Sequence, residues 1–149
     1  MPSLFEQQTA NEVLQRINNL QPNSPKQWGK MNVSQMMAHV NHVLKIGIGD
    51  ITPKPTFMMK IMGPMIKRVV MSEKPFKQGL PTGPNFEMKE QKDFNIEKEN
   101  LLNTYRRFVD AGEAAADGRT HPIFGKLTAN EWGFSQWKHF DHHLKQFGV

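Results

Sequence analysis

The sequence predicts an all-α protein, a bundle of four main helices in a single domain spanning residues 1–149. Four segments place apolar residues at helical spacing, and no segment of useful length alternates apolar and polar residues as strands do. A chain of 149 residues can also bury one substantial core. Between the second and third main helices we expect a Pro-rich connection that carries an extra short helix.

The first main helix is predicted over residues 10–20. Thr9 and Glu12 form a capping-box pattern at its start, although Ser3 and Glu6 repeat the pattern more weakly and leave the start open. The prolines that follow residue 20 should end the helix, because proline cannot continue the hydrogen-bond pattern.

The second main helix begins near Asn32 or Ser34, either of which can cap it, and ends near Gly47 and Gly49. His39 lies at the border of its apolar face. That face consists of Val33, Met36, Met37, Val40, Val43 and Leu44.

The irregular part of the chain covers residues 50–94, in which prolines recur. Residues 57–70 are predicted to form a helix kinked at Gly63-Pro64. This helix is apolar nearly all round, so we expect other elements or the partner subunit of a homodimer to bury it. Contact with a membrane surface is the alternative. We expect residues 72–93 to form an extended, turn-rich loop packed across the bundle.

The third and fourth main helices have the clearest patterns. Asn95 is the predicted cap of the third helix, and Thr128 with Glu131 forms a capping box for the fourth, which runs to about Phe147. The apolar stripe of the third is Leu101, Leu102, Tyr105, Phe108, Val109 and Gly112. The buried stripe of the fourth is Trp132, Gln136, His139, Phe140, His143 and Phe147.

The composition excludes several classes of site. There is no cysteine, so disulfides, thiolate metal ligands and a cysteine nucleophile are absent. The first residues lack the layout of a signal peptide, and no apolar run is long enough for a membrane span. A cytoplasmic location is the simplest expectation.

The net charge of +5 is unevenly distributed. Residues 54–77 contain six basic residues and one acid, Glu73. We interpret this segment as a solvated basic face rather than a nucleic-acid or lipid footprint, because stacking aromatic residues are few. No nucleic-acid partner is therefore expected.

Two histidines on the fourth helix provide the sharpest chemical clue. His139 and His143 are four residues apart, so both lie on one face of the helix, within its buried stripe. Buried imidazoles need partners, either hydrogen-bonding groups or a metal ion, and the spacing alone leaves both open. Two ligands are too few for a metal site. His39 on a facing helix is the best third ligand. His42 and His142 are second choices, and both are expected to be solvated surface histidines instead.

Four further polar residues have weaker signals. Gln136 and Gln146 lie about one turn from the histidines and are candidates to orient them. Tyr105 is predicted to be a core tyrosine with a satisfied hydroxyl rather than a donor to a ligand. His121 precedes Pro122 and is expected to cap a loop or to lie at the surface rather than to bind metal.

Several motifs together carry a family resemblance. They are Trp28-Gly29-Lys30-Met31, Gln35-Met36-Met37-Ala38-His39, His121 to Thr128, Glu131-Trp132-Gly133 and Lys138 to Val149. With these motifs the chain resembles the DinB-like (YfiT-like) superfamily of four-helix metal-binding proteins. It is most similar to a branch of that superfamily known as a domain of unknown function.

The resemblance implies a divalent metal bound by one histidine of the second helix and an HxxxH pair of the last. The matching residues are His39, His139 and His143. Zinc and nickel suit imidazole ligands best. Three such ligands leave coordination positions open, and some relatives are thiol-dependent enzymes. The expected function is therefore metal binding, with a thiol-linked transferase or a hydrolase of an unknown small-molecule substrate as the candidate activity.

Two other functions stay open at this stage, and enzyme activity itself is undecided. The first is a non-catalytic binding or scaffold protein whose histidines are satisfied core residues. The second, less favoured, is a nucleic-acid or membrane-surface binder that uses residues 54–77.

Overall fold

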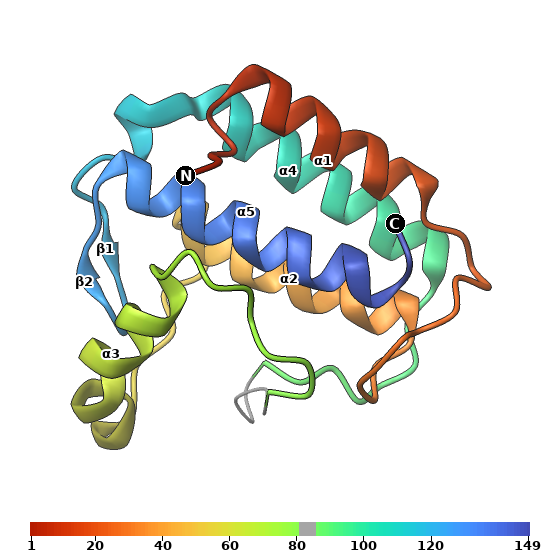
Figure 1. The fold of residues 1–149 in the computed structure, drawn as a ribbon, viewed down its shortest axis with the longest axis horizontal. Helices are drawn as coiled ribbons and strands as arrows, with labels where there is room; N and C mark the ends of the chain where they lie inside the picture. The colour runs from red at the N-terminus through yellow and green to blue at the C-terminus, as the bar shows by residue number, and fades with distance from the viewer. Residues whose placement is uncertain (81–85) are drawn as a thin grey trace.

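The computed structural model describes residues 1–80 and 86–149, and it is all-α apart from one short hairpin. The predicted four-helix bundle is confirmed, and the extra helix lies where the sequence predicts it, between the second and third main helices (Figure 1). The elements in order are α1 (Gln7–Asn19), α2 (Val33–Ile48), α3 (Phe57–Val70), α4 (Phe94–Ala116), β1 (Thr120–His121), β2 (Gly125–Lys126) and α5 (Ala129–Gln146).

The larger of two hydrophobic clusters lies between α1, α2, α4 and α5, whereas α3 projects from one end of the bundle (Figure 1). The apolar stripes of the four main helices supply the core, as their spacing predicts. Leu4, from the segment before α1, is fully buried among them. Other fully or nearly fully buried side chains are Val13, Ile17, Met36, Met37, Val40, Leu44, Leu101, Tyr105, Phe108, Phe140 and Leu144.

The start of α1 differs from the prediction. The helix begins at Gln7 with Glu6 at the N-cap, so the expected start at residue 10 with Thr9 as cap is wrong. The reason is that the turn at residues 3–6 places Leu4 in the core and starts the helix earlier. Thr9 is then inside the first turn, where its hydroxyl donates to the Glu6 carboxylate over 3.1 Å.

The caps of the other main helices follow the sequence with one exception. Asn32 caps α2 and Thr128 caps α5, each in a complete capping box. Gly49 ends α2 in the left-handed conformation, which favours glycine. The predicted cap Asn95 is wrong, because the side chain of Asp93 accepts from the backbone N–H of Ile96 and starts α4 two residues earlier.

The helix predicted at residues 57–70 is confirmed, but its burial is not. Gly63 is the only buried residue of α3 in the described structure. In the described parts of the predicted loop over residues 72–93 there are turns and bends and neither helix nor strand, and residues 81–85 lie outside the described residues. No helix in the described part of the chain is long and apolar enough to cross a membrane.

Candidate metal centre

Three histidines from two neighbouring helices converge inside the bundle. His39 comes from α2, and His139 and His143 come from α5. Each offers one ring nitrogen, and these three atoms lie within 4.8 Å of one another. The Nε2 atoms of His39 and His139 are 3.0 Å apart. Two nitrogens bound to one tetrahedral zinc at 2.0–2.1 Å are about 3.3 Å apart, so the cluster has the dimensions of a metal site.

A backbone carbonyl fixes the tautomer of His39. Its Nδ1 lies 2.7 Å from the carbonyl oxygen of Phe86. A carbonyl can only accept a hydrogen bond, so Nδ1 carries the proton. The Nε2 atom, which faces the other histidines, is therefore left with its lone pair.

An amide fixes the tautomer of His143 in the same way. Gln146 donates through Nε2 to the carbonyl oxygen of Trp28 over 2.8 Å, which orients its amide. Its Oε1 then lies 2.8 Å from Nδ1 of His143 and accepts from it. This leaves Nε2 of His143 as the nitrogen free to bind. Gln146 thus has the orienting position that the sequence predicts.

His139 is the member of the cluster with an unmet requirement. Its Nδ1 is buried and has no hydrogen-bond partner among the described residues. Its Nε2 faces Nε2 of His39, which has no proton to donate. A proton on Nε2 of His139 can satisfy Nε2 of His39, but it leaves Nδ1 of His139 as a buried acceptor without a donor, which is unfavourable.

Burial keeps the three imidazoles neutral. It lowers the pKa of His39 and places that of His139 well below the usual range of histidine. The pKa of His143 is lowered to about 3, mainly by burial and further by the neighbouring His39. Neutral imidazole is the form that binds metal, so protons compete weakly with a metal ion here at neutral pH.

The other histidines lie outside the cluster. His42 packs on the ring of Phe86, and His142 lies between the rings of Trp28 and Phe76. Both are partly exposed, so the expectation of fully solvated side chains is only approximate.

Of the two roles expected for His121, a loop cap or a surface position, the structure shows the loop cap. Its Nδ1 accepts hydrogen bonds from the backbone N–H groups of Ile123 and Phe124, at 3.1 and 3.2 Å. Burial lowers its pKa to about 4, so the ring stays neutral and can accept these bonds at neutral pH.

Two polar core residues do not take part in the site. Tyr105 donates its hydroxyl to the carbonyl of Ala10 over 2.8 Å, which confirms its prediction as a satisfied core tyrosine. The side chain of Gln136 is buried and makes no hydrogen bond to the histidines among the described residues. Its expected orienting role therefore has no structural support.

A cavity of about 390 Å³ opens beside the cluster. His143 and Gln146 form its inner wall, and Trp28, Lys30, Met31, Leu80, Glu87 and His142 are among its other lining residues. A small molecule of moderate polarity fits this mixture of aromatic, apolar and charged groups.

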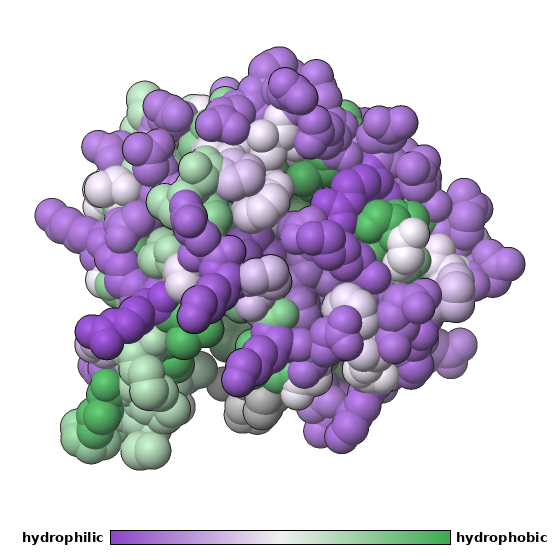
Figure 2. Space-filling model, viewed as in Figure 1, coloured by the Kyte–Doolittle hydropathy of each residue, from purple (hydrophilic) through white to green (hydrophobic). Residues whose placement is uncertain are grey.

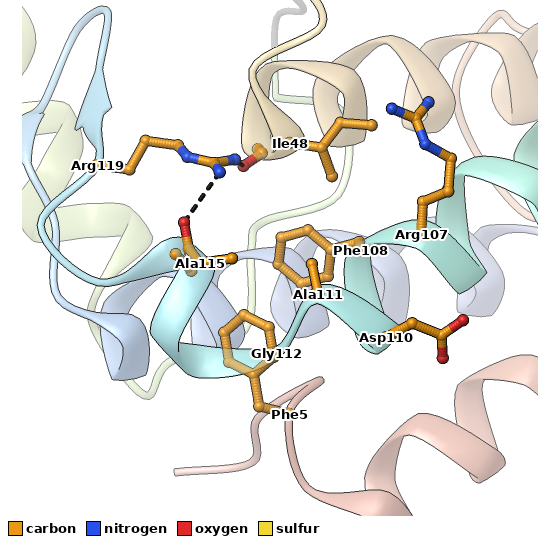
Figure 3. Close-up of a pocket in the computed structure, with 11 residues that line it drawn as sticks. Phe5, Ile48, Arg107, Phe108, Asp110, Ala111, Gly112, Ala115 and Arg119 are labelled. Carbon is orange, nitrogen blue, oxygen red and sulfur yellow. Dashed lines mark hydrogen bonds between the residues drawn. The ribbon is translucent and has the colours of Figure 1, made fainter.

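A second cavity, of about 440 Å³, lies at the other end of α2, where α4 is broken at Gly112 (Figure 3). Arg119 crosses it and donates to the carbonyl oxygens of Gly47 and Ala115. None of the six histidines lines this cavity. The cavity beside His143 is therefore the one that matters for the candidate site.

Together, the fold and the cluster define a helical-bundle protein with a three-histidine site built from its second and last main helices. The chain belongs to the family described as "Protein of unknown function (DUF1569)", whose pattern matches residues 4–148. No curated protein and no solved structure matches the chain. The DinB-like resemblance stays a prediction.

Proposed function

We propose that the protein binds one divalent metal ion through Nε2 of His39, His139 and His143. The observation that supports the proposal is the set of tautomers. Hydrogen bonds to Phe86 and Gln146 leave His39 and His143 with unprotonated Nε2 atoms at the cluster. Converging lone pairs repel one another unless a proton or a cation lies between them, and a metal ion satisfies all three together.

The donor set favours zinc or nickel, since both bind neutral imidazole well. Three protein ligands leave coordination positions open, which is typical of catalytic rather than structural sites. A bound ion there supplies Lewis-acid polarisation of a small molecule. The cavity beside His143 supports this function, because it gives a small molecule a place next to the ligands.

We infer a metal-dependent transferase or hydrolase as the candidate activity. The chain has no thiol of its own, so a thiol-linked reaction would use the thiol of a cosubstrate. Trp28 has a buried indole N–H without a partner among the described residues, and it lines the cavity. The nitrogen itself is inaccessible, so the ring of Trp28 is the part that can contact a molecule in the cavity.

Elemental analysis of protein purified without a histidine tag tests the metal site. We expect about one divalent ion per chain. Zinc or nickel is then added back to protein whose metal a chelator has removed. At a free metal concentration of about a thousand times the dissociation constant, the ion should stabilise the fold by about 4 kcal/mol. For a chain of this length that corresponds to a rise of roughly 10 °C in melting temperature. Metal-free protein with an unchanged melting temperature would instead support the scaffold alternative with satisfied core histidines.

Replacing Gln146 with Leu should weaken metal binding without removing a ligand. The change deletes the acceptor that holds His143 in its binding tautomer, and such losses reduce metal affinity by about 10- to 100-fold. The measurement is a titration against a chromophoric chelator. Gln136→Leu is the matched control, since this buried glutamine of the same helix makes no hydrogen bond to the described histidines. Equal affinities in both variants would contradict the role of Gln146.

A further inference from the structure

The outer face of α3 exposes a patch of large apolar side chains. Phe57 is 77% exposed and Ile61 is 60% exposed, values unusual for such residues. The patch appears green over α3 at the lower left of Figure 2. Its members recur at helical spacing on one side of the helix, and they are Phe57, Met58, Ile61, Met62, Met65 and Val69.

Contacts at the C-terminal end of α3 and on the side opposite the patch join the helix to α5. The buried ammonium of Lys138 on α5 donates to the carbonyl oxygens of Val69, Val70 and Ser72, at 2.9, 3.1 and 2.6 Å. A lysine so placed adds hydrogen bonds to carbonyls at the end of a helix, where intrahelical donors are few. Lys67 also pairs with Glu131 at 2.8 Å. These contacts orient the apolar face outward, away from the bundle.

Basic residues lie on α3 and in the segments that flank it in the sequence. Across residues 54–77 the single acid is Glu73. Five basic residues of this segment are exposed and form no ion pair among the described residues: Lys54, Lys60, Arg68, Lys74 and Lys77. Arg68 and Lys60 lie on α3 itself, beside the apolar side chains. An occupant of this face must therefore offer both an apolar layer and negative charge.

We propose that α3 docks on an anionic lipid surface, a function separate from the metal centre. Phe57, Ile61 and Met65 would enter the boundary between headgroups and acyl chains, while the basic residues contact lipid phosphates. A second copy of the chain is a poorer occupant, because two such faces would bring like charges together.

Sedimentation with lipid vesicles tests the proposal on the full chain. We expect binding to vesicles that contain phosphatidylglycerol at least about tenfold stronger than to phosphatidylcholine alone, and weaker binding as salt increases. Equal binding to the neutral vesicles, or no binding to either, would overturn the proposal.

Variants of α3 distinguish contact with lipid from contact with a second copy of the chain. The double change Ile61→Glu with Met65→Glu should abolish vesicle binding, and Lys60→Glu with Arg68→Glu should weaken it about tenfold or more. The matched control is Ile96→Glu on α4, where the side chain is also exposed, and its binding should be unchanged. All these side chains are exposed, so the melting temperature should stay constant. A dimer that dissociates in Ile61→Glu would show that the face joins two copies and would refute the lipid contact.

Discussion

Replacing any one of His39, His139 and His143 with Ala is expected to reduce the metal content from about one ion per chain to a trace. The reason is the small number of ligands. Each variant leaves two imidazoles, and two neutral nitrogens do not retain an ion against dialysis with a chelator. The measurement is elemental analysis of each untagged variant, together with the change in melting temperature when zinc or nickel is added.

His142→Ala is the sharpest control for this prediction. His142 is adjacent in sequence to His143, and their ring centroids are 5.1 Å apart, but it does not belong to the converging group. We expect it to retain metal. Circular dichroism confirms that each variant is folded before its metal is measured. Full metal content in His39→Ala would refute the assignment of the third ligand on α2.

The candidate site shows which parts of a metal centre a sequence can predict. The periodicity of a helix places His139 and His143 on one face, and it places His39 at the border of a facing stripe. The structure brings these three together. The groups that fix their tautomers were only partly predictable. Gln146 has a side chain one turn from His143, whereas the partner of His39 is the backbone carbonyl of Phe86, which has no signature in the sequence.

The fold also has some features that the sequence predicts and others that it does not. Periodicity located every main helix, but Thr9 and Glu12 matched a capping box inside a helix that had already started. The capping-box pattern contains no information about Leu4, which packs in the core and moves the start of α1 to an earlier residue. Lys138 is the opposite case, since a lysine is expected at a surface. It is buried because its ammonium donates to several carbonyls at and just after the end of α3, which lie 66 to 69 residues away in sequence.

Gly133 is where the N-terminal segment crosses α5, and Gly133→Ala is expected to destabilise the fold. The backbone N–H of Leu4 donates to the carbonyl of Gly133 over 3.2 Å. A Cβ atom at this position would overlap the hydroxyl of Ser3 and approach Cδ2 of Phe5 to 2.9 Å. The glycine of the Glu131-Trp132-Gly133 motif therefore has a packing reason that the sequence alone does not reveal.

Two opposing effects decide the sign of this change. Alanine in place of glycine favours the helix by about 1 kcal/mol. Overpacking costs about 1–3 kcal/mol. If the segment is displaced, the loss of the fully buried Leu4 adds a cost of about 2–5 kcal/mol. We expect the unfavourable effects to dominate, with a net loss of about 2–3 kcal/mol and a melting temperature lower by roughly 5–10 °C.

A double-mutant cycle identifies the contact responsible. Ser3→Gly removes the side chain that the new Cβ meets first, so Gly133→Ala should cost less in that background than in the wild type. Phe5 remains close, so the recovery should be partial. Thermal unfolding of the four proteins gives the coupling free energy. If Gly133→Ala is instead more stable than the wild type, the helical preference dominates, and the N-terminal segment does not pack across α5 at this point.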